Sequence, residues 1–379
     1  MNKSVLAGLS LIICLYLFWA WSVFAKPPFN DLHDWQETDF SRSTIQFEDM
    51  FEGGPGKDGI PAIDQPKFES MQQAHTWLHD REPVVAYSYA GEARAYPLQI
   101  LMYHEIVNDS VGGQTISVTY CPLCNAAMVF SRQYKNQILE FGVSGKVYNS
   151  NLVMYDRQTQ SWWLQFTGEG IVGELTHVKL DLLPSQIVSF AQFQEYYPDG
   201  KVLSKNTGFN KKYGVNPYAH YDSRKLPVVW FYRKPFDDRL PAMERVLGVA
   251  MDQQQAMAFP LTTLSDAAIV QTKVASMPIL IISKAGMASA VDEILIKESK
   301  EVLAAAAFSR VVSGKRLDFM IRQGKIIDTQ TESVWNMFGQ AIEGAYKGQR
   351  LQQVDRGVYF SFVWLDFYPK SSIYQNKIQ

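Results

Sequence analysis

The residues of this sequence whose types and spacing most clearly suggest chemistry are two cysteines, in Cys121-Pro-Leu-Cys124. Two thiolates at this spacing can bind one soft or borderline metal ion, or can close a reversible disulfide. The only other cysteine, Cys14, lies in an apolar N-terminal run, so this pair is the whole thiol inventory of the rest of the chain. We therefore expect the chemistry of the protein at this turn.

A histidine and two carboxylates precede the cysteines in His104-Glu-Ile-Val-Asn-Asp109. A site built on Cys121, Cys124 and His104 suits Cu(I), or Zn(II) with an open coordination position, because thiolate and imidazole are the ligands these ions prefer. Glu105 could orient the imidazole or act as a general base. The predicted catalytic residues are His104, Glu105, Cys121 and Cys124.

Further polar residues are candidates for binding a cofactor or ligand, although a capped turn and a polar hairpin loop would use the same residue types. They are Asn108, Asp109, Ser144, Tyr148, Asn149 and Asn151.

Three functions are compatible with this set of residues. The first is a copper or zinc site used for metal handling or metal-dependent redox chemistry, and the second is a metal-free thiol-disulfide oxidoreductase with His104 as the base. The third is a non-catalytic ligand-binding module in which the pair is a structural disulfide. A disulfide that closes so short a loop stabilises the fold by only about 2 kcal/mol, which is less than a longer loop would give. A purely structural role for the Cys121–Cys124 pair is therefore less attractive.

An internal repeat indicates which elements must position these residues. Landmarks recur in the same order in residues 80–205 and 244–375, which we interpret as two tandem copies of one module. The paired segments begin at Ala93 and Ala256, Phe130 and Phe308, Leu139 and Leu317, and Asp156 and Asp328, with Trp163 and Trp335 following at the same interval.

The second copy lacks the chemistry of the first. The segment His104 to Asp109 aligns with Ala267 to Thr272, where every ionisable side chain is gone, and Cys121 to Cys124 aligns with Lys284 to Met287. Beyond that turn, the alignment requires a 15-residue insertion in the second copy, which is then about six residues shorter at the segment matching 147–151. The cysteines are therefore not needed to fold the module, and we interpret the second copy as a degenerate support.

Each module reads as α+β and β-rich, with mostly antiparallel sheets. Period-two runs at 84–89 and 115–120, with 128–130 and 138–141, predict strands, and Gly112-Gly113 predicts a hairpin turn. The apolar spacing in 97–105 and 189–197 predicts helices. Because 127–132 also reads as strand, the cysteines are expected in a turn between strands.

Length and charge narrow the remaining possibilities. The 379 residues suggest two domains, and 36 basic against 38 acidic residues give a net charge of −2, so nucleic acid is not an expected partner. We expect a metal ion or small molecule as partner; the sequence does not identify a protein partner.

Two segments lie outside the modules. Residues 26–79 read as an irregular arm, and residues 206–243, which are rich in Pro, Gly and aromatics, read as an ordered connector.

The N-terminal 25 residues, with Lys3 followed by an apolar run ending near Ala25, have the outline of a signal peptide or membrane anchor. We expect the protein to be exported, either periplasmic or anchored to the outer face of the inner membrane.

Several motifs together resemble a family of exported bacterial proteins known as domain of unknown function 3179. They are Gly-Glu-Ala-Arg-Ala-Tyr-Pro-Leu, His-Glu-Ile-Val-Asn-Asp, Thr-Tyr-Cys-Pro-Leu-Cys, Phe-Gly-Val-Ser-Gly, Tyr-Asn-Ser-Asn-Leu and Tyr-Asp-Arg-Gln-Thr. They cover most of residues 80–205, and a weaker second copy is also typical of that family. Asn125 stands where a Gly commonly follows the second cysteine. The resemblance implies export but brings no established activity.

Overall fold

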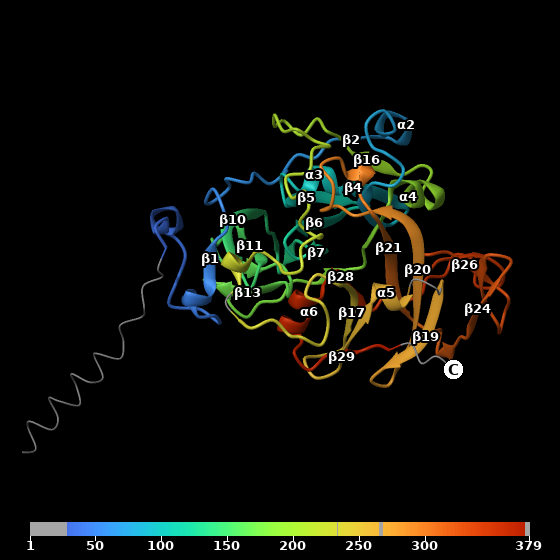
Figure 1. Ribbon diagram of the computed structural model, residues 1–379. Coiled ribbons are helices and arrows are strands. Elements are labelled where there is room, and N and C mark those ends of the chain that lie inside the picture. The colour runs from blue at the N-terminus through green and yellow to red at the C-terminus, as the bar shows by residue number, and fades with distance from the viewer. Residues whose placement is uncertain (1–28, 233, 265–267, 376–379) are drawn as a thin grey trace, which may run out of the picture.

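The computed structural model describes residues 29–232, 234–264 and 268–375, and it is built largely from antiparallel strands (Figure 1). The predicted signal peptide or anchor lies outside the described residues. Among the described strand pairs, only two are parallel: β4 (Glu92–Pro97) with β16 (Lys201–Leu203), and β18 (Ala256–Pro260) with β29 (Ser372–Ile373). The expected β-rich α+β class with mostly antiparallel sheets is confirmed.

The cysteines lie in a four-stranded antiparallel sheet of order β14-β7-β6-β5. Gly112 and Gly113 both have positive φ and form the predicted hairpin turn between β5 and β6. The strands are β5 (Ile106–Val111), β6 (Gln114–Cys121), β7 (Ala126–Ser131) and β14 (Leu182–Leu183).

A second sheet, of order β1-β10-β11-β12-β13, contributes a long hairpin that reaches the cysteine turn. Its strands are β1 (Met50–Glu52), β10 (Phe141–Tyr148), β11 (Asn151–Asp156), β12 (Trp162–Leu164) and β13 (Glu169–Val172). The residues expected as an irregular arm supply β1 and an aromatic cluster that includes buried Trp35 and Phe47. That segment is therefore part of the packed structure.

A third sheet, of order β15-β3-β4-β16-β2, carries the helices of the first module. Ser189 caps α4 through a capping box with Gln192, which explains why the predicted helix begins there. The helix predicted at 97–105 is shorter. The elements are β2 (Phe68–Ser70), α2 (Met71–Ala74), β3 (Pro83–Tyr89), β4 (Glu92–Pro97), α3 (Leu98–Leu101), β15 (Gln186–Ser189), α4 (Phe190–Tyr196) and β16 (Lys201–Leu203), with the small hairpin β8 (Gln133–Tyr134) and β9 (Gln137–Ile138) nearby.

Residues 244–375 follow the same order of elements, except that no described strand corresponds to β14, and this order accords with the tandem repeat, which stays an interpretation. The sheets have the orders β28-β17-β18-β29, β19-β20-β21, β24-β25-β26-β27 and β22-β23. The elements are β17 (Arg245–Ala250), β18 (Ala256–Pro260), α5 (Leu261–Leu264), β19 (Ile269–Val274), β20 (Met277–Ala288), β21 (Glu301–Ser309), β22 (Val311–Val312), β23 (Lys315–Arg316), β24 (Phe319–Arg322), β25 (Lys325–Asp328), β26 (Val334–Trp335), β27 (Ala341–Glu343), β28 (Asp355–Phe360), α6 (Ser361–Phe367) and β29 (Ser372–Ile373).

The two modules pack against each other reciprocally. Strand β28 of the second contacts β7 of the first, and β15 of the first contacts β21 of the second. One apolar cluster contains the cysteines together with second-module residues such as Phe360 and Trp364. The thiol turn is therefore buried at the junction of the modules.

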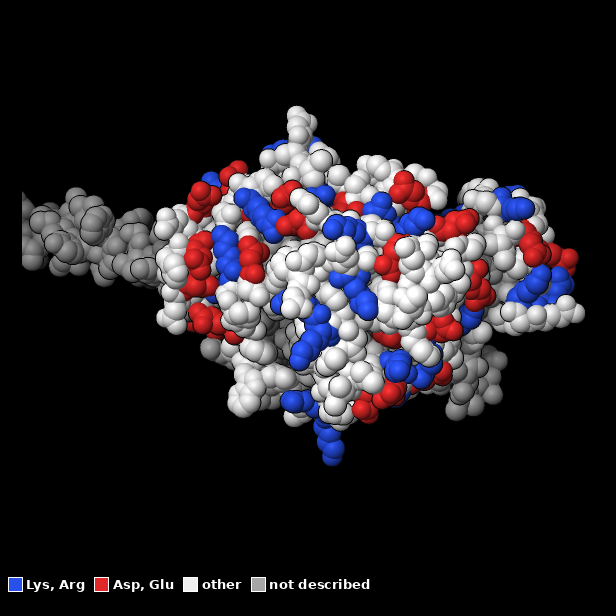
Figure 2. Space-filling view, turned by 90° about the horizontal axis from the view of Figure 1, so that it is seen from above, with Lys and Arg blue, Asp and Glu red and all other residues white. Residues whose placement is uncertain are grey.

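The described helices are short, and the surface carries mixed charge. The 3₁₀ segments among the described residues are η1 (Leu32–Trp35), η2 (Phe47–Asp49), η3 (Val229–Phe231) and η4 (Ile296–Glu298). Within the described ranges, no helix has the length and apolar character needed to cross a bilayer. On the face shown in Figure 2, acidic and basic side chains are interspersed, as the near-zero net charge suggests.

Candidate thiol site

The Cys121–Cys124 turn joins β6 to β7, as its strand context predicted. The Cys124 N–H bonds the Cys121 carbonyl at 3.2 Å, and the following Asn125 has φ of 53°. Asparagine tolerates this left-handed conformation better than most residues other than glycine, so the turn forms with Asn125 in place of Gly. Both cysteines are buried free thiols, with their sulfur atoms 3.1 Å apart.

The β10–β11 hairpin ends directly over these sulfurs. Its two turn residues, Asn149 and Ser150, both have positive φ, as a tight two-residue turn between antiparallel strands requires. This turn places the Ser150 carbonyl oxygen 3.0 Å from Cys124 Sγ and 3.6 Å from Cys121 Sγ. A single carbonyl therefore accepts from both thiols.

Asn151 connects the sulfurs to a buried polar network. Its Nδ2 lies 3.4 Å from Cys124 Sγ and donates to Gln165 Oε1 at 2.8 Å, while its Oδ1 accepts from the Phe166 N–H. Gln165 in turn donates to Thr119 Oγ1 at 3.0 Å. Burial raises the pKa of the Cys124 thiol well above its ordinary value, and the Asn151 donor opposes that shift.

Glu105 is one of three ionisable side chains that line a cavity with Cys121; the others are Lys146 and Tyr218. The cavity has a volume of about 40 Å³, which is room for two or three water molecules, and Cys124 does not line it. The Glu105 backbone has φ of 57°, and its carbonyl accepts from the Tyr120 N–H at 2.8 Å. Burial raises the pKa of the Glu105 carboxyl to about 8, so the side chain carries a proton at neutral pH and can exchange it nearby.

The connector, residues 206–243, covers the site. Tyr221 donates its hydroxyl to the Leu123 carbonyl at 3.0 Å, and the Phe231 carbonyl accepts from the Ser150 N–H at 3.0 Å. Tyr218 lines the cavity beside Glu105, and burial raises its pKa. The connector is thus an ordered lid packed on the first module.

His104 does not join the cysteines, contrary to the expectation of a Cys-Cys-His site. Its Nδ1 lies 2.7 Å from the Pro61 carbonyl and its Nε2 lies 2.5 Å from the Tyr213 hydroxyl, so both ring nitrogens are engaged elsewhere. Burial lowers the pKa of His104 to about 4, which keeps the imidazole neutral. In this geometry His104 anchors the connector lid and is not the base for a thiol.

The other predicted binding residues also have structural partners. Asn108 bonds both backbone groups of Phe141 with its side chain, and Asp109 accepts from Arg94 and from the Tyr96 hydroxyl at 2.6 Å. Ser144 bonds backbone groups within its own hairpin. Tyr148 ends β10 opposite Met50 of β1. Of the predicted binding set, Asn151 contacts the Cys124 sulfur, and Asn149 lies in the turn that carries the Ser150 carbonyl.

The described residues therefore offer a dithiol with a nearby acid, and they contain no group of three His, Cys, Asp or Glu side chains placed to hold a metal ion. Such a dithiol can give up two electrons and two protons by closing to a disulfide, and the Glu105 carboxyl beside Cys121 is a group that can accept a proton.

Sequence reasoning missed several members of this site. Thr119 and Gln165 could have been found by the comparison that identified the cysteines, because Ile282 and Met337 stand at the equivalent positions. Ser150 acts through its backbone carbonyl, which any residue type would supply. The connector residues that cover the site lie about 100 positions from the cysteines in the sequence, so their contact leaves no local sequence signal.

The family model for a protein of unknown function, DUF3179, matches residues 57–371, which is most of the chain. The chain belongs to this family. No curated protein and no solved structure matches it.

Proposed function

We propose that Cys121 and Cys124 form a two-electron thiol-disulfide redox couple that reacts with a small hydroperoxide. The observation that carries this proposal is the asymmetry of the pair: two sulfurs 3.1 Å apart, of which Cys121 alone lines the cavity shared with Glu105. Cys121 is then the sulfur that meets the oxidant, and Cys124 is the resolving thiol.

The size of the cavity favours a hydroperoxide over a protein disulfide. With room for only two or three water molecules, the cavity accepts hydrogen peroxide, whereas a protein disulfide could reach the sulfur only if the lid moved. Thiolates react with peroxide to give a sulfenic acid, which a neighbouring thiol converts to a disulfide.

The reaction balances with Glu105 carrying the Cys121 proton. In the minority of molecules whose Glu105 is ionised at neutral pH, the carboxylate takes the Cys121 proton, the thiolate attacks one peroxide oxygen, the O–O bond breaks, and Glu105 returns the proton to the leaving hydroxide as water. Cys124 next attacks the Cys121 sulfenic sulfur, and the Cys124 proton joins the displaced hydroxide as the second water. Two thiols and one peroxide become one disulfide and two waters, and an external thiol restores the pair by exchange.

The test is a peroxide pulse followed by intact mass measurement, with Cys14→Ser in every variant so that only the pair can react. The reference protein should lose two hydrogens. Cys124→Ser should instead gain one oxygen that a sulfenic-acid reagent traps, and Cys121→Ser should stay unmodified over the same pulse. Glu105→Gln should slow oxidation about tenfold or more, because the proton carrier is gone.

Three results would overturn the proposal. One is a Cys121→Ser variant oxidised as fast as Cys124→Ser. Another is a disulfide that excess small thiol cannot reduce, which would indicate a structural staple. The third is sub-micromolar anaerobic binding of Cu(I) or Zn(II) that needs both cysteines and blocks their oxidation, which would return the site to metal handling.

A further inference from the structure

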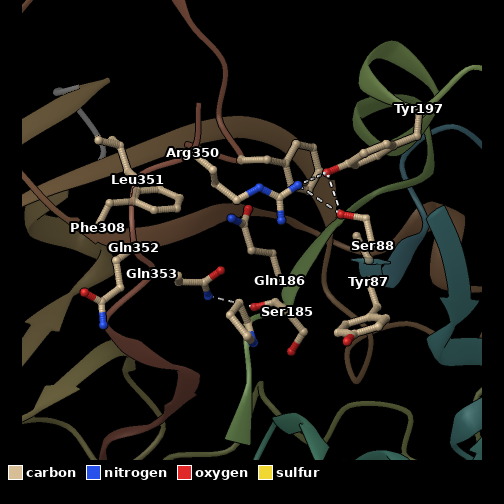
Figure 3. A pocket seen from close by; sticks show the side chains of 13 residues that line it. Tyr87, Ser88, Ser185, Gln186, Tyr197, Phe308, Arg350, Leu351, Gln352 and Gln353 are labelled. Atoms are coloured by element: carbon tan, nitrogen blue, oxygen red, sulfur yellow. Dashed lines mark hydrogen bonds between the residues drawn. The ribbon is translucent and has the colours of Figure 1, made fainter. Parts of the chain in front are cut away.

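A cavity of about 290 Å³ lies between the two modules, away from the cysteines (Figure 3). The first module contributes Tyr87, Ser88 and Tyr197 to its wall, and the second contributes Phe308, Phe338 and Arg350. Only the junction of the modules creates this cavity, and clefts at such junctions are common positions for small-molecule sites.

Arg350 is the charged group of this cavity. Its guanidinium donates to Ser88 Oγ at 3.1 Å and to the Tyr197 hydroxyl at 3.4 Å, as the dashed lines in Figure 3 show. Within the described part of the chain no carboxylate forms an ion pair with Arg350, and no Asp or Glu lines the cavity. A guanidinium whose hydrogen-bond partners among the described residues are two neutral hydroxyls keeps most of its capacity for an anion.

The position equivalent to Arg350 in the first module is Lys179, and its surroundings differ. There Lys179 forms an isolated β-bridge with Glu169, and the two side chains are ion-paired at 3.4 Å. The equivalent bridge in the second module joins Arg350 to Gln340. An amide thus replaces the carboxylate, and the cation, now an arginine, faces the other module.

The remaining walls define what else the ligand contains. The Phe308 and Phe338 rings are apolar, and in Figure 3 the Gln186 amide projects into the same space as Arg350. Arginine binds planar carboxylates through two parallel hydrogen bonds. We propose that this cavity binds a small organic carboxylate, with the carboxylate on Arg350 and an apolar body against the phenylalanine rings.

The test compares a charged probe with a neutral one of the same shape. Phenylacetate and phenylacetamide are titrated into the full chain by calorimetry, with inorganic phosphate as a third probe. Phenylacetate should bind saturably in the low-millimolar range and at least about tenfold more tightly than the amide, as loss of a charged hydrogen bond implies. Phosphate lacks the apolar body and should bind more weakly than phenylacetate.

Arg350→Gln should weaken phenylacetate binding at least about tenfold. Lys179→Gln, which removes the equivalent paired charge of the first module, is the matched control and should stay within about twofold. Equal affinity for phenylacetate and phenylacetamide, no saturable binding of phenylacetate, or phosphate binding as tight as phenylacetate would each overturn the proposal. These titrations use the unaltered protein, so they decide the matter even if Arg350→Gln fails to fold.

Discussion

The two modules differ most in what lies behind their equivalent β-turns. The first module buries Thr119, Asn151 and Gln165 there, all hydrogen-bonded. The strand registers place Ile282 and Met337 of the second module at the positions of Thr119 and Gln165, and both pack in an apolar cluster. A counterpart of Asn151 is absent from the second-module hairpin because β24 and β25 have only four residues each and turn at Gln323-Gly324.

This difference supports the interpretation that the polar network serves the thiols. Burying amides and hydroxyls costs free energy unless each finds a partner, and an apolar interior forms the same sheet without that requirement. Among the described residues, the network is present only in the module whose turn carries the sulfurs, and it holds the Asn151 donor on Cys124. The extra length of the β10–β11 hairpin has the same consequence, since it delivers the Ser150 carbonyl.

The largest effect on stability is expected at a buried aspartate that both modules have. Asp156 accepts from the backbone and hydroxyl of Thr159 and from Trp163 Nε1, and Asp328 accepts from Thr331 and Trp335 in the same way. Asp156→Ala and Asp328→Ala should each lower the free energy of unfolding by about 3 kcal/mol, because buried donors are left unpaired.

Urea denaturation followed by tryptophan fluorescence measures both variants. Glu343→Ala, which breaks an exposed ion pair with Lys325, is the control and should change stability by less than about 0.5 kcal/mol. A large loss for one aspartate and none for the other would break the equivalence of the modules.

The local parts of this comparison could be predicted from sequence, and the long-range parts could not. Alternation predicted the strands around Cys121, apolar spacing predicted the helix α4, and paired landmarks identified Asp156 and Asp328, because all of these depend on neighbours along the chain. The assignment of His104 failed because its partner, Tyr213, lies 109 positions away and takes the ring nitrogen that a metal would need. Spacing alone cannot reveal such competition.

The second prediction exchanges the polar network for its apolar counterpart. Gln165→Met should lower the free energy of unfolding by about 2 kcal/mol, because the Asn151 and Thr119 side chains each lose a partner. Adding Thr119→Ile, which removes one of those stranded groups, should recover part of the loss, so the two substitutions are non-additive in a double-mutant cycle.

The reciprocal variant sharpens this test. Met337→Gln in the second module should cost at least as much as Gln165→Met, because Ile282 offers the new amide no hydrogen bond. If Met337→Gln were neutral, the second module would accommodate polar groups as well as the first, and the network could not be ascribed to the thiols.

The third prediction compares two buried carboxyl groups: Glu105, which lies beside the thiols, and Asp355, which does not line their cavity. The Glu105 carboxyl has a pKa of about 8 when folded and an ordinary value of 4.5. Between these values the folded chain holds a proton that the unfolded chain releases, so this group's contribution to stability is complete below pH 4.5 and is lost as pH rises through 8. Relative to the parent, Glu105→Gln should therefore gain roughly 1 kcal/mol per pH unit between pH 6 and 8.

Asp355 of the second module provides the matched control, because burial raises its pKa to about 7. Both variants are measured by urea denaturation from pH 5 to 9. Asp355→Asn should also gain stability relative to the parent as pH rises, and this gain should level off about one pH unit below that of Glu105→Gln. Only Glu105→Gln should also slow the oxidation of Cys121, since Glu105 alone of the two lines the cavity of that sulfur. If Asp355→Asn slowed oxidation equally, the effect would come from general stability, and the proton-carrying role of Glu105 would be lost.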